Sequence, residues 1–383
     1  MQRTLASLLL LIPFVALAQG GDRVSAYVAG MAALEDSSYG EAVRWFERAV
    51  AEDPQFADAY FGMAMAYAPE SPLHDERRIS QSLERAIRLS PDNPRYLEAQ
   101  LQAYRRTMPE ARAYSTTDTR RPVLASRLLA VDPENALAHG ELALNAFLEF
   151  DWRRQMARRQ GGWDPHATGG TSGAANRARA RAEEHMIAAL RAEPGNISVH
   201  RLRLRLAVLA EDNEALERAA TSFAVANPAN PYAQLYLGLM AHRRGNVEQA
   251  DLYFDKGIRS MDATERIEFE RIVHLMGHGE RAAFEADSST AVSRFWRSRD
   301  PRLLSQENER QIEHYARLAM ADLLFAEPQN DLRGWETPRG EVVVRYGMPD
   351  GHGRWLGADF TAKRFGALER WVYEGEDGFS LVF

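Results

Sequence analysis

The sequence contains no cysteine, and only two of its 47 basic residues are lysines. The absence of cysteine excludes disulfide bonds, thiolate metal sites and a cysteine nucleophile. Basic residues are also outnumbered by 54 acidic ones, and the resulting net charge of −7 gives no general affinity for nucleic acid or for an anionic membrane. We therefore predict no nucleic-acid partner for this chain, whose apolar share of 45% is ordinary for a globular protein.

Long hydrophobic runs are absent too, apart from one near the N-terminus. The run from Leu5 to Ala18 follows the basic residue Arg3, is interrupted by Pro13 and ends on an Ala-x-Ala pattern at residues 16–18. It is shorter than the roughly 20 residues that a membrane-spanning helix needs. We predict that residues 1–18 are a cleaved signal peptide, with an uncleaved anchor as the alternative. The mature protein is then periplasmic or extracellular, without stable membrane insertion, and no cysteine follows that would carry a lipid.

Familiar catalytic and cofactor patterns are missing as well. The sequence has no Gly-x-Ser-x-Gly nucleophile turn, no Gly-x-Gly-x-x-Gly after a strand and no His-Glu-x-x-His. The glycine-rich stretch 160–175 lacks the lysine of a phosphate-binding loop, so we interpret it as a surface loop. His274 and His278 have the spacing of two metal ligands on a helix, but the neighbouring glycines favour a helix end there. We predict no metal, no cofactor and no catalytic residue.

What the sequence does contain is a repeated pair of helices, clearest between Tyr232 and Asp262. Small residues at Gly238 and Ala250 alternate with the bulky Phe254 at helical spacing, and a turn at residues 244–246 separates the two halves. Small residues let two helices approach closely while an aromatic ring fills the space between them. This unit resembles a tetratricopeptide repeat, whose period is about 34 residues.

The same pattern recurs, with a proline closing each unit because proline cannot continue a helix. The closing prolines are Pro54, Pro91, Pro133, Pro194 and Pro228. We predict about six units within residues 19–262, some of them with insertions. The predicted fold class is mainly α: a tetratricopeptide-type helical superhelix followed by a small α+β domain with an antiparallel sheet.

The resemblance to tetratricopeptide repeats implies a protein or peptide partner, bound on the inner surface that the first helix of each unit lines. We expect the contacts to come from first-helix residues that point away from the packing stripe. The candidates for this groove are Tyr60, Arg95, His139, His200, Arg203 and Gln234.

The repeat pattern stops after Asp262. We predict connecting helices over residues 263–330, including an amphipathic one at about 306–325, and a small β-rich part over 331–383. Within that part, the run of valines at 342–344 predicts a strand over 341–346, followed by a turn at 347–351. Two further strands are predicted at 368–373 and 379–383, joined by a hairpin turn at 375–378.

A set of residues in this C-terminal region resembles the GWxTD domain, a family found in exported bacterial proteins, often beside tetratricopeptide repeats. The matching residues are Phe295, Trp296, Arg299, Asp300, Gly334, Trp335, Thr337, Arg339, Gly340, Arg345, Tyr346, Gly347 and Asp350. One departure concerns Pro338, which stands where the signature of the family has aspartate. The resemblance implies an architecture and brings no established activity.

Two interpretations of this region remain open. In the first, Trp296, Trp335 and Tyr346 pack together with Arg299 and Arg339 as a structural joint. In the second, the arginines Arg299, Arg339 and Arg345 clamp an anion or a peptide carboxylate.

For the whole chain, the leading hypothesis is a non-enzymatic binding scaffold, and a permanent component of an envelope assembly is a variant of it. The alternative is an enzyme with its site in the C-terminal domain. That hypothesis relies on the ionisable residues Arg299, Asp300, Arg339, Arg345, Asp350 and His352.

Overall fold

The computed structural model describes residues 22–107, 119–160, 173–272, 275–286, 288–301, 307–327, 332–355, 368–374 and 378–383. The predicted signal peptide at 1–18, residues 161–172 of the glycine-rich stretch, His274 and most of the predicted hairpin turn lie outside these ranges. Within them, no helix combines the length and the apolar character that crossing a membrane requires.

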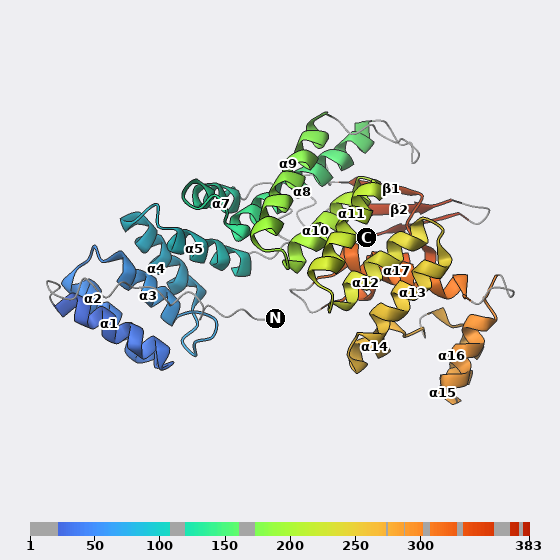
Figure 1. Cartoon of the computed structure of the whole chain (residues 1–383), viewed down its shortest axis with the longest axis horizontal. Coiled ribbons are helices and arrows are strands. Elements are labelled where there is room, and N and C mark those ends of the chain that lie inside the picture. The colour runs from blue at the N-terminus through green and yellow to red at the C-terminus, as the bar shows by residue number, and fades with distance from the viewer. Residues whose placement is uncertain are drawn as a thin grey trace. The chain divides into compact units, whose positions relative to one another are not determined.

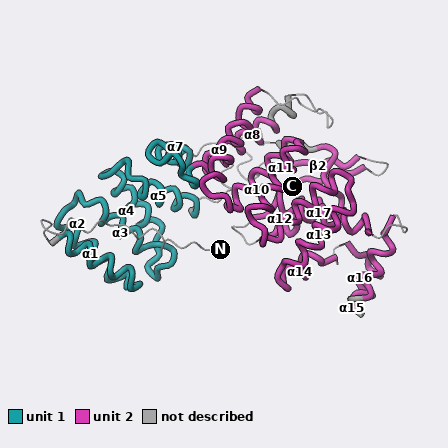
Figure 2. The backbone as a smooth tube through the Cα atoms, in the orientation of Figure 1, with its two compact units in different colours: residues 1–138 teal, residues 139–383 magenta. Residues whose placement is uncertain are grey.

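The chain divides into two compact units, residues 1–138 and 139–383 (Figure 2). The helices of the first unit are α1 (Asp22–Glu35), α2 (Tyr39–Glu52), α3 (Ala57–Ala66), α4 (Glu76–Leu89), α5 (Pro94–Thr107), α7 (Arg120–Val131) and the start of α8 (Ala136–Gln160). The second unit continues with α9 (Gly173–Ala192), α10 (Ile197–Leu209), α11 (Asn213–Ala226), α12 (Pro231–Arg243) and α13 (Val247–Arg259).

Antiparallel helix pairs form because a glycine on one helix faces a phenylalanine on the next. A Cβ atom on Gly30 of α1 would lie 2.7 Å from Cε1 of Phe46 on α2. A Cβ atom on Gly238 of α12 would lie 2.7 Å from Cε1 of Phe254 on α13. Both rings are fully buried. The same steric relation at both ends of the array confirms the predicted tetratricopeptide-type pairing, which Figure 1 shows along the chain.

The C-terminal region adds further helices. These are α14 (Ala263–Phe269), α15 (His278–Ala286), α16 (Ser288–Arg297), α17 (Glu309–Phe325), the 3₁₀ turn η4 (Gly334–Glu336) and α18 (Pro338–Tyr346). Helix α17, predicted from its amphipathic pattern, packs against α10, α12 and α13. Its buried face therefore belongs to the same hydrophobic core as the last two repeats.

The predicted strand over 341–346 is wrong, because these residues form the second half of α18. Thr337 caps the N-terminus of this helix: its side chain accepts a hydrogen bond from the backbone N–H of Gly340. Pro338 occupies the first helical position, where its fixed φ is favourable. Gly347 ends the helix with φ of +85°. These end signals outweigh the strand preference of the three valines, two of which are buried.

The small sheet has three antiparallel strands in the order β1-β2-β3. They are β1 (Gly351–Trp355), β2 (Leu368–Tyr373) and β3 (Phe379–Val382). The predicted strands at 368–373 and 379–383 are confirmed, whereas β1 was not predicted. Trp371 of β2 is buried, with its ring centroid 5.8 Å from that of Phe325 at the end of α17. The sheet is thereby attached to α17.

Candidate functional site

Two of the predicted groove residues cannot contact a partner. His200 on α10 is 1% exposed, and its ring stacks on Phe223 of α11 at 5.1 Å. Its Nε2 lies 2.9 Å from the carbonyl oxygen of Pro194. Gln234 on α12 is 5% exposed and faces α13, where a Cβ atom on Gly257 would lie 3.3 Å from its own Cβ. Both side chains point at second helices, so their assignment to the groove is wrong.

The helix face that these residues were expected to occupy belongs to Arg201 and Tyr236, and it is covered by α17. Asp322 of α17 is fully buried, and its Oδ2 lies 3.0 Å from Nη2 of Arg201. The hydroxyl of Tyr236 donates to the same oxygen at 3.2 Å, and Nη2 of Arg201 also donates to the carbonyl of Asp322 at 2.9 Å. The inner face of the last two repeats therefore already holds a helix of the same chain.

The other second-unit candidates lie elsewhere. His139 on α8 is half-buried, and its Nδ1 lies 3.0 Å from Nδ1 of His185 on α9. Arg203 on α10 is also half-buried, and burial lowers the pKa of its guanidinium. The described residues contain no group of three side chains placed to hold a metal ion.

In the first unit, the first helices α1, α3 and α5 share a face with polar and aromatic side chains. The hydroxyl of Tyr96 donates to Oδ1 of Asp58 at 2.6 Å. The guanidinium carbon of Arg95 lies 5.1 Å from the ring centroid of Phe61, and its buried Nε has no hydrogen-bond partner among the described residues. Burial raises the pKa of Tyr27 on α1 to about 12.

The candidate Tyr60, next to Phe61 on α3, is half-buried and contacts the second helix α4. The guanidinium carbon of Arg85 lies 5.6 Å from its ring centroid. Tyr27, Asp58, Tyr60 and Arg95 are half-buried, whereas the rings of Phe61 and Tyr96 are buried. We call the half-buried side chains of Tyr27, Asp58 and Arg95 the first-unit surface.

Two glycines and the threonine of the C-terminal motif allow α17, η4 and α18 to pack closely at one junction. A Cβ atom on Gly334 would lie 2.0 Å from the carbonyl oxygen of Ala321, and one on Gly340 would lie 1.7 Å from the carbonyl oxygen of Gly334. The hydroxyl of Thr337 donates to the Gly334 carbonyl at 2.7 Å. No larger residue fits either glycine position unless the backbone moves, so these motif residues are structural.

Other motif residues attach the sheet and α14 to this junction. The ring of Trp335 packs edge-on against Phe269 of α14, with centroids 5.5 Å apart. Nη2 of Arg339 lies 2.8 Å from Oε2 of Glu369 on β2. Asp350 accepts a hydrogen bond from the backbone N–H of Glu374 at 2.8 Å.

The predicted five-residue joint is therefore wrong as a single cluster. Trp335 and Arg339 follow Gly334, which contacts the C-terminal half of α17. Trp296, Arg299 and Tyr346 instead line a cavity beside the N-terminal half of this helix. The length of α17 separates the two groups.

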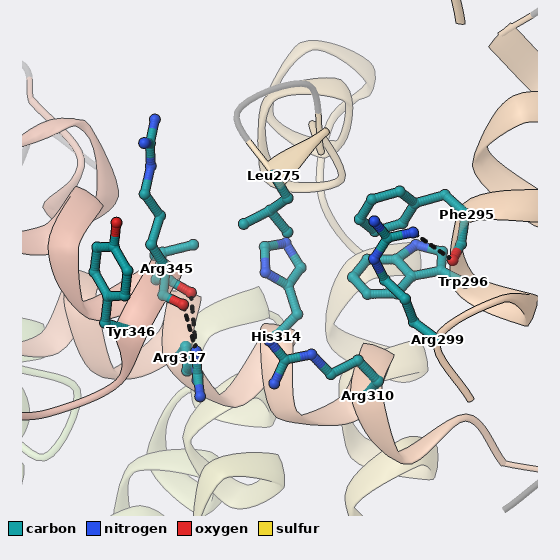
Figure 3. A pocket seen from close by; sticks show the side chains of 10 residues that line it. Leu275, Phe295, Trp296, Arg299, Arg310, His314, Arg317, Arg345 and Tyr346 are labelled. Carbon is teal, nitrogen blue, oxygen red and sulfur yellow. Dashed lines mark hydrogen bonds between the residues drawn. The ribbon is translucent and has the colours of Figure 1, made fainter. Parts of the chain in front are cut away.

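This cavity has a volume of about 280 Å³. It lies between α16, α17 and α18 (Figure 3). Its lining residues are Leu275, Phe295, Trp296, Arg299, Arg310, His314, Arg317, Val344, Arg345 and Tyr346. Figure 3 shows His314 in the middle, between the Phe295–Trp296 side and the Arg345–Tyr346 side.

The cavity lining is basic, and acidic groups meet its arginines from outside. Nη1 of Arg299 lies 2.8 Å from Oε1 of Glu280, and its guanidinium carbon lies 3.8 Å from the ring centroid of Phe295. Nη2 of Arg345 lies 2.6 Å from Oε1 of Glu341. None of the ten lining residues is acidic.

Arg310 and Arg317 share one carboxylate, that of Glu313. Burial raises the pKa of Glu313, but the two guanidinium groups outweigh it and hold this pKa below its usual value. Arg317 also donates to the carbonyl of Arg345 at 2.9 Å, which satisfies the C-terminal end of α18.

The residues of the enzyme hypothesis do not converge on this cavity. Only Arg299 and Arg345 line it, whereas Arg339 and Asp350 bind the backbone and side chains of the sheet region. Asp300 follows α16 and is not part of the lining, and His352 lies on β1. The arrangement is suited to holding negative charge rather than to general acid–base chemistry by a pair of carboxylates.

Comparison with known proteins gives similar folds only. No protein-family model matches the chain, and no curated protein matches it. Similar solved structures include PilW, a type IV pilus biogenesis factor (15% identity, TM-score 0.39, 61% of this chain and 91% of that chain). Pseudomonas aeruginosa PilF has 15% identity and a TM-score of 0.43 over 65% of this chain and 96% of that chain.

A third example is a thermophilic tetratricopeptide-repeat protein of Thermus thermophilus, with 14% identity and a TM-score of 0.28. The match covers 64% of this chain and 96% of that chain. Because these TM-scores are below 0.5, the fold assignment rests on the helix pairing described above.

Proposed function

We propose that this protein is an exported, non-enzymatic scaffold whose first-unit surface binds an amphipathic helix of a protein partner. The observation that carries the proposal is the packing of α17 on the first helices α10 and α12 of the last repeats. In the second unit this kind of surface accepts a helix. Helix-in-groove recognition uses the same packing between different chains.

The charges of the first-unit surface suggest what the partner helix carries. In the second unit, Arg201 pairs with the buried Asp322 of α17. In the first unit, the buried Nε of Arg95 has no hydrogen-bond acceptor among the described residues. A carboxylate on a partner helix would pair with the half-buried guanidinium of Arg95, and charge-assisted hydrogen bonds to arginine are among the stronger ones.

The C-terminal region is, in this proposal, a GWxTD-like domain that closes the repeat array. Gly334, Thr337 and Gly340 of its motif have structural roles at the junction with α17. Pro338, where the family has aspartate, sits at the first position of α18, a place suited to proline. The departure from the motif is therefore compatible with the same local structure.

Site-specific photocrosslinking tests the proposal. The full chain would carry benzoylphenylalanine in place of Tyr60, and crosslinked partners would be identified from cells of the native organism. We expect a protein adduct that is lost in Arg95→Glu, because glutamate repels the carboxylate of the partner. Arg88→Glu is the matched control, since Arg88 is exposed on the second helix α4.

The proposal predicts that the adduct survives Arg88→Glu and that the crosslinked peptide of the partner is helical and acidic. An adduct that is unaffected by Arg95→Glu, or no adduct at this position, contradicts binding at the first-unit surface. An adduct that is lost equally in Arg95→Glu and Arg88→Glu shows only a general effect of charge and also contradicts binding at this surface.

A further inference from the structure

We propose that the cavity between α16, α17 and α18 is a binding site for a small organic anion, a carboxylate or phosphate attached to a flat apolar group. This site is separate from the first-unit surface, so it stands or falls independently of the scaffold proposal. Four guanidinium groups and one imidazole line it, and no lining residue is acidic.

The charge balance around the cavity favours an anion. The four arginines have Glu280, Glu313 and Glu341 as their carboxylate partners, and Glu313 is shared by two of them. Among the described residues, these ion pairs join four arginines to three glutamates, so one carboxylate serves two guanidinium groups. Guanidinium groups bind carboxylate and phosphate through paired hydrogen bonds, and their planar geometry suits both anions.

The apolar side chains of the cavity favour a flat apolar group as the remainder of the ligand. Phe295 and Trp296 are buried, with their ring centroids 4.9 Å apart in an edge-on arrangement. On the opposite side, Tyr346 is 50% exposed and open to solvent. A flat group can therefore enter beside Tyr346 and pack against the Phe295–Trp296 side while its anionic end meets the arginines.

The size of the cavity limits the ligand to a small molecule or to one side chain or terminus of a larger one. Its volume of about 280 Å³ is just below the usual range for sites that enclose small ligands. Both a free aromatic acid and the end of a peptide present the required chemistry.

The experiment uses the full chain and three probes: benzoate, phenyl phosphate and the neutral benzyl alcohol. Saturation-transfer NMR and calorimetric titration would measure binding to the unmodified protein and to Arg310→Gln and Arg345→Gln. The matched control is Arg218→Gln. Arg218 lies on α11 outside the cavity and, like Arg345, pairs with a glutamate one helical turn earlier.

We expect both anions to bind and benzyl alcohol to bind far more weakly. Either cavity variant should weaken anion binding by about tenfold or more, because each removes a charge-assisted contact. The control should change it by less than about twofold. Tighter binding of a peptide ending in phenylalanine than of its amidated form would identify a chain terminus as the source of the anion.

Three results would overturn the inference. One is the absence of anion binding to the unmodified protein, and another is equal binding of benzyl alcohol. The third is an equal loss in Arg345→Gln and Arg218→Gln, which would show a general charge effect. Circular dichroism of each variant ensures that a loss of binding is not a loss of folding.

Discussion

Replacing Asp322 by alanine tests how the C-terminal region is held on the repeats. The substitution removes a fully buried carboxylate that pairs with Arg201 at 3.0 Å and accepts from Tyr236 at 3.2 Å. The guanidinium of Arg201 then keeps only the backbone carbonyl of residue 322, and the buried hydroxyl of Tyr236 loses its partner. Breaking a buried ion pair by removing one member costs about 3–5 kcal/mol.

That cost corresponds to a large change in local opening. Since about 1.4 kcal/mol is a tenfold change in an equilibrium constant, the amide hydrogens of α17 should exchange roughly a hundredfold to several thousandfold faster. Hydrogen exchange followed by mass spectrometry measures this on α17 peptides directly. Urea unfolding followed by circular dichroism gives an independent measure of the loss in stability.

The control is Asp255→Ala on α13, which removes an exposed pair with Arg259 at 2.8 Å. Surface pairs one helical turn apart contribute about 0.3–0.5 kcal/mol, so this variant should change little. Adding Arg201→Met to Asp322→Ala should restore part of the stability, because the unpaired buried charge is then removed. The reasoning is refuted if Asp322→Ala destabilises α17 no more than Asp255→Ala does.

Two further predictions concern the cap of α18 and a buried histidine. Thr337→Val should lower the free energy of unfolding by about 1–2 kcal/mol, because the hydroxyl that caps α18 is lost. Thr337→Ser keeps a hydroxyl and should retain most of the stability. Equal losses of stability in urea titrations of both variants would contradict this role. Burial lowers the pKa of His200 below 6.5, so this residue binds fewer protons in the folded protein than in the unfolded chain. Its contribution to the free energy of unfolding is therefore fully present above pH 6.5 and is lost as the pH falls. His200→Gln should therefore flatten the fall in stability between about pH 7 and pH 5, and an unchanged pH dependence would show that other groups cause it.

The sequence was sufficient to predict the helix pairs, because their contacts are short in range. Gly30 and Phe46 lie within one unit, as do Gly238 and Phe254, and a small residue facing an aromatic ring can be recognised from spacing alone. The strands β2 and β3 were also predictable from their alternating pattern and the short connection between them.

Contacts over long sequence distances could not be predicted. Asp322 meets Arg201 across 121 residues, and nothing in the repeat pattern indicates that α17 covers α10 and α12. The error at His200 has a simpler cause. Neighbouring positions on a helix differ by about 100° in direction, so a shift of one residue exchanges the buried His200 for the inner-face Arg201.

The error at α18 shows which local signals are decisive. The β-branched residues at 342–344 favour a strand, but Thr337, Pro338 and Gly347 mark the two ends of a helix. Burial of Val343 and Val344 against the rest of the core then stabilises that helix. Propensity is weaker than capping combined with tertiary packing.

The contacts of α17 also restrict how this array can change its length. Because α17 touches α10, α12 and α13 at once, its position depends on the spacing of the last two repeats. A repeat of about 34 residues inserted between α13 and α17 would carry the helix away from the arginine and tyrosine that hold it. Duplication upstream of α10 leaves all three contacts intact. Relatives of this protein should therefore gain and lose repeats on the N-terminal side of α10, with the final two repeats and the C-terminal region inherited together.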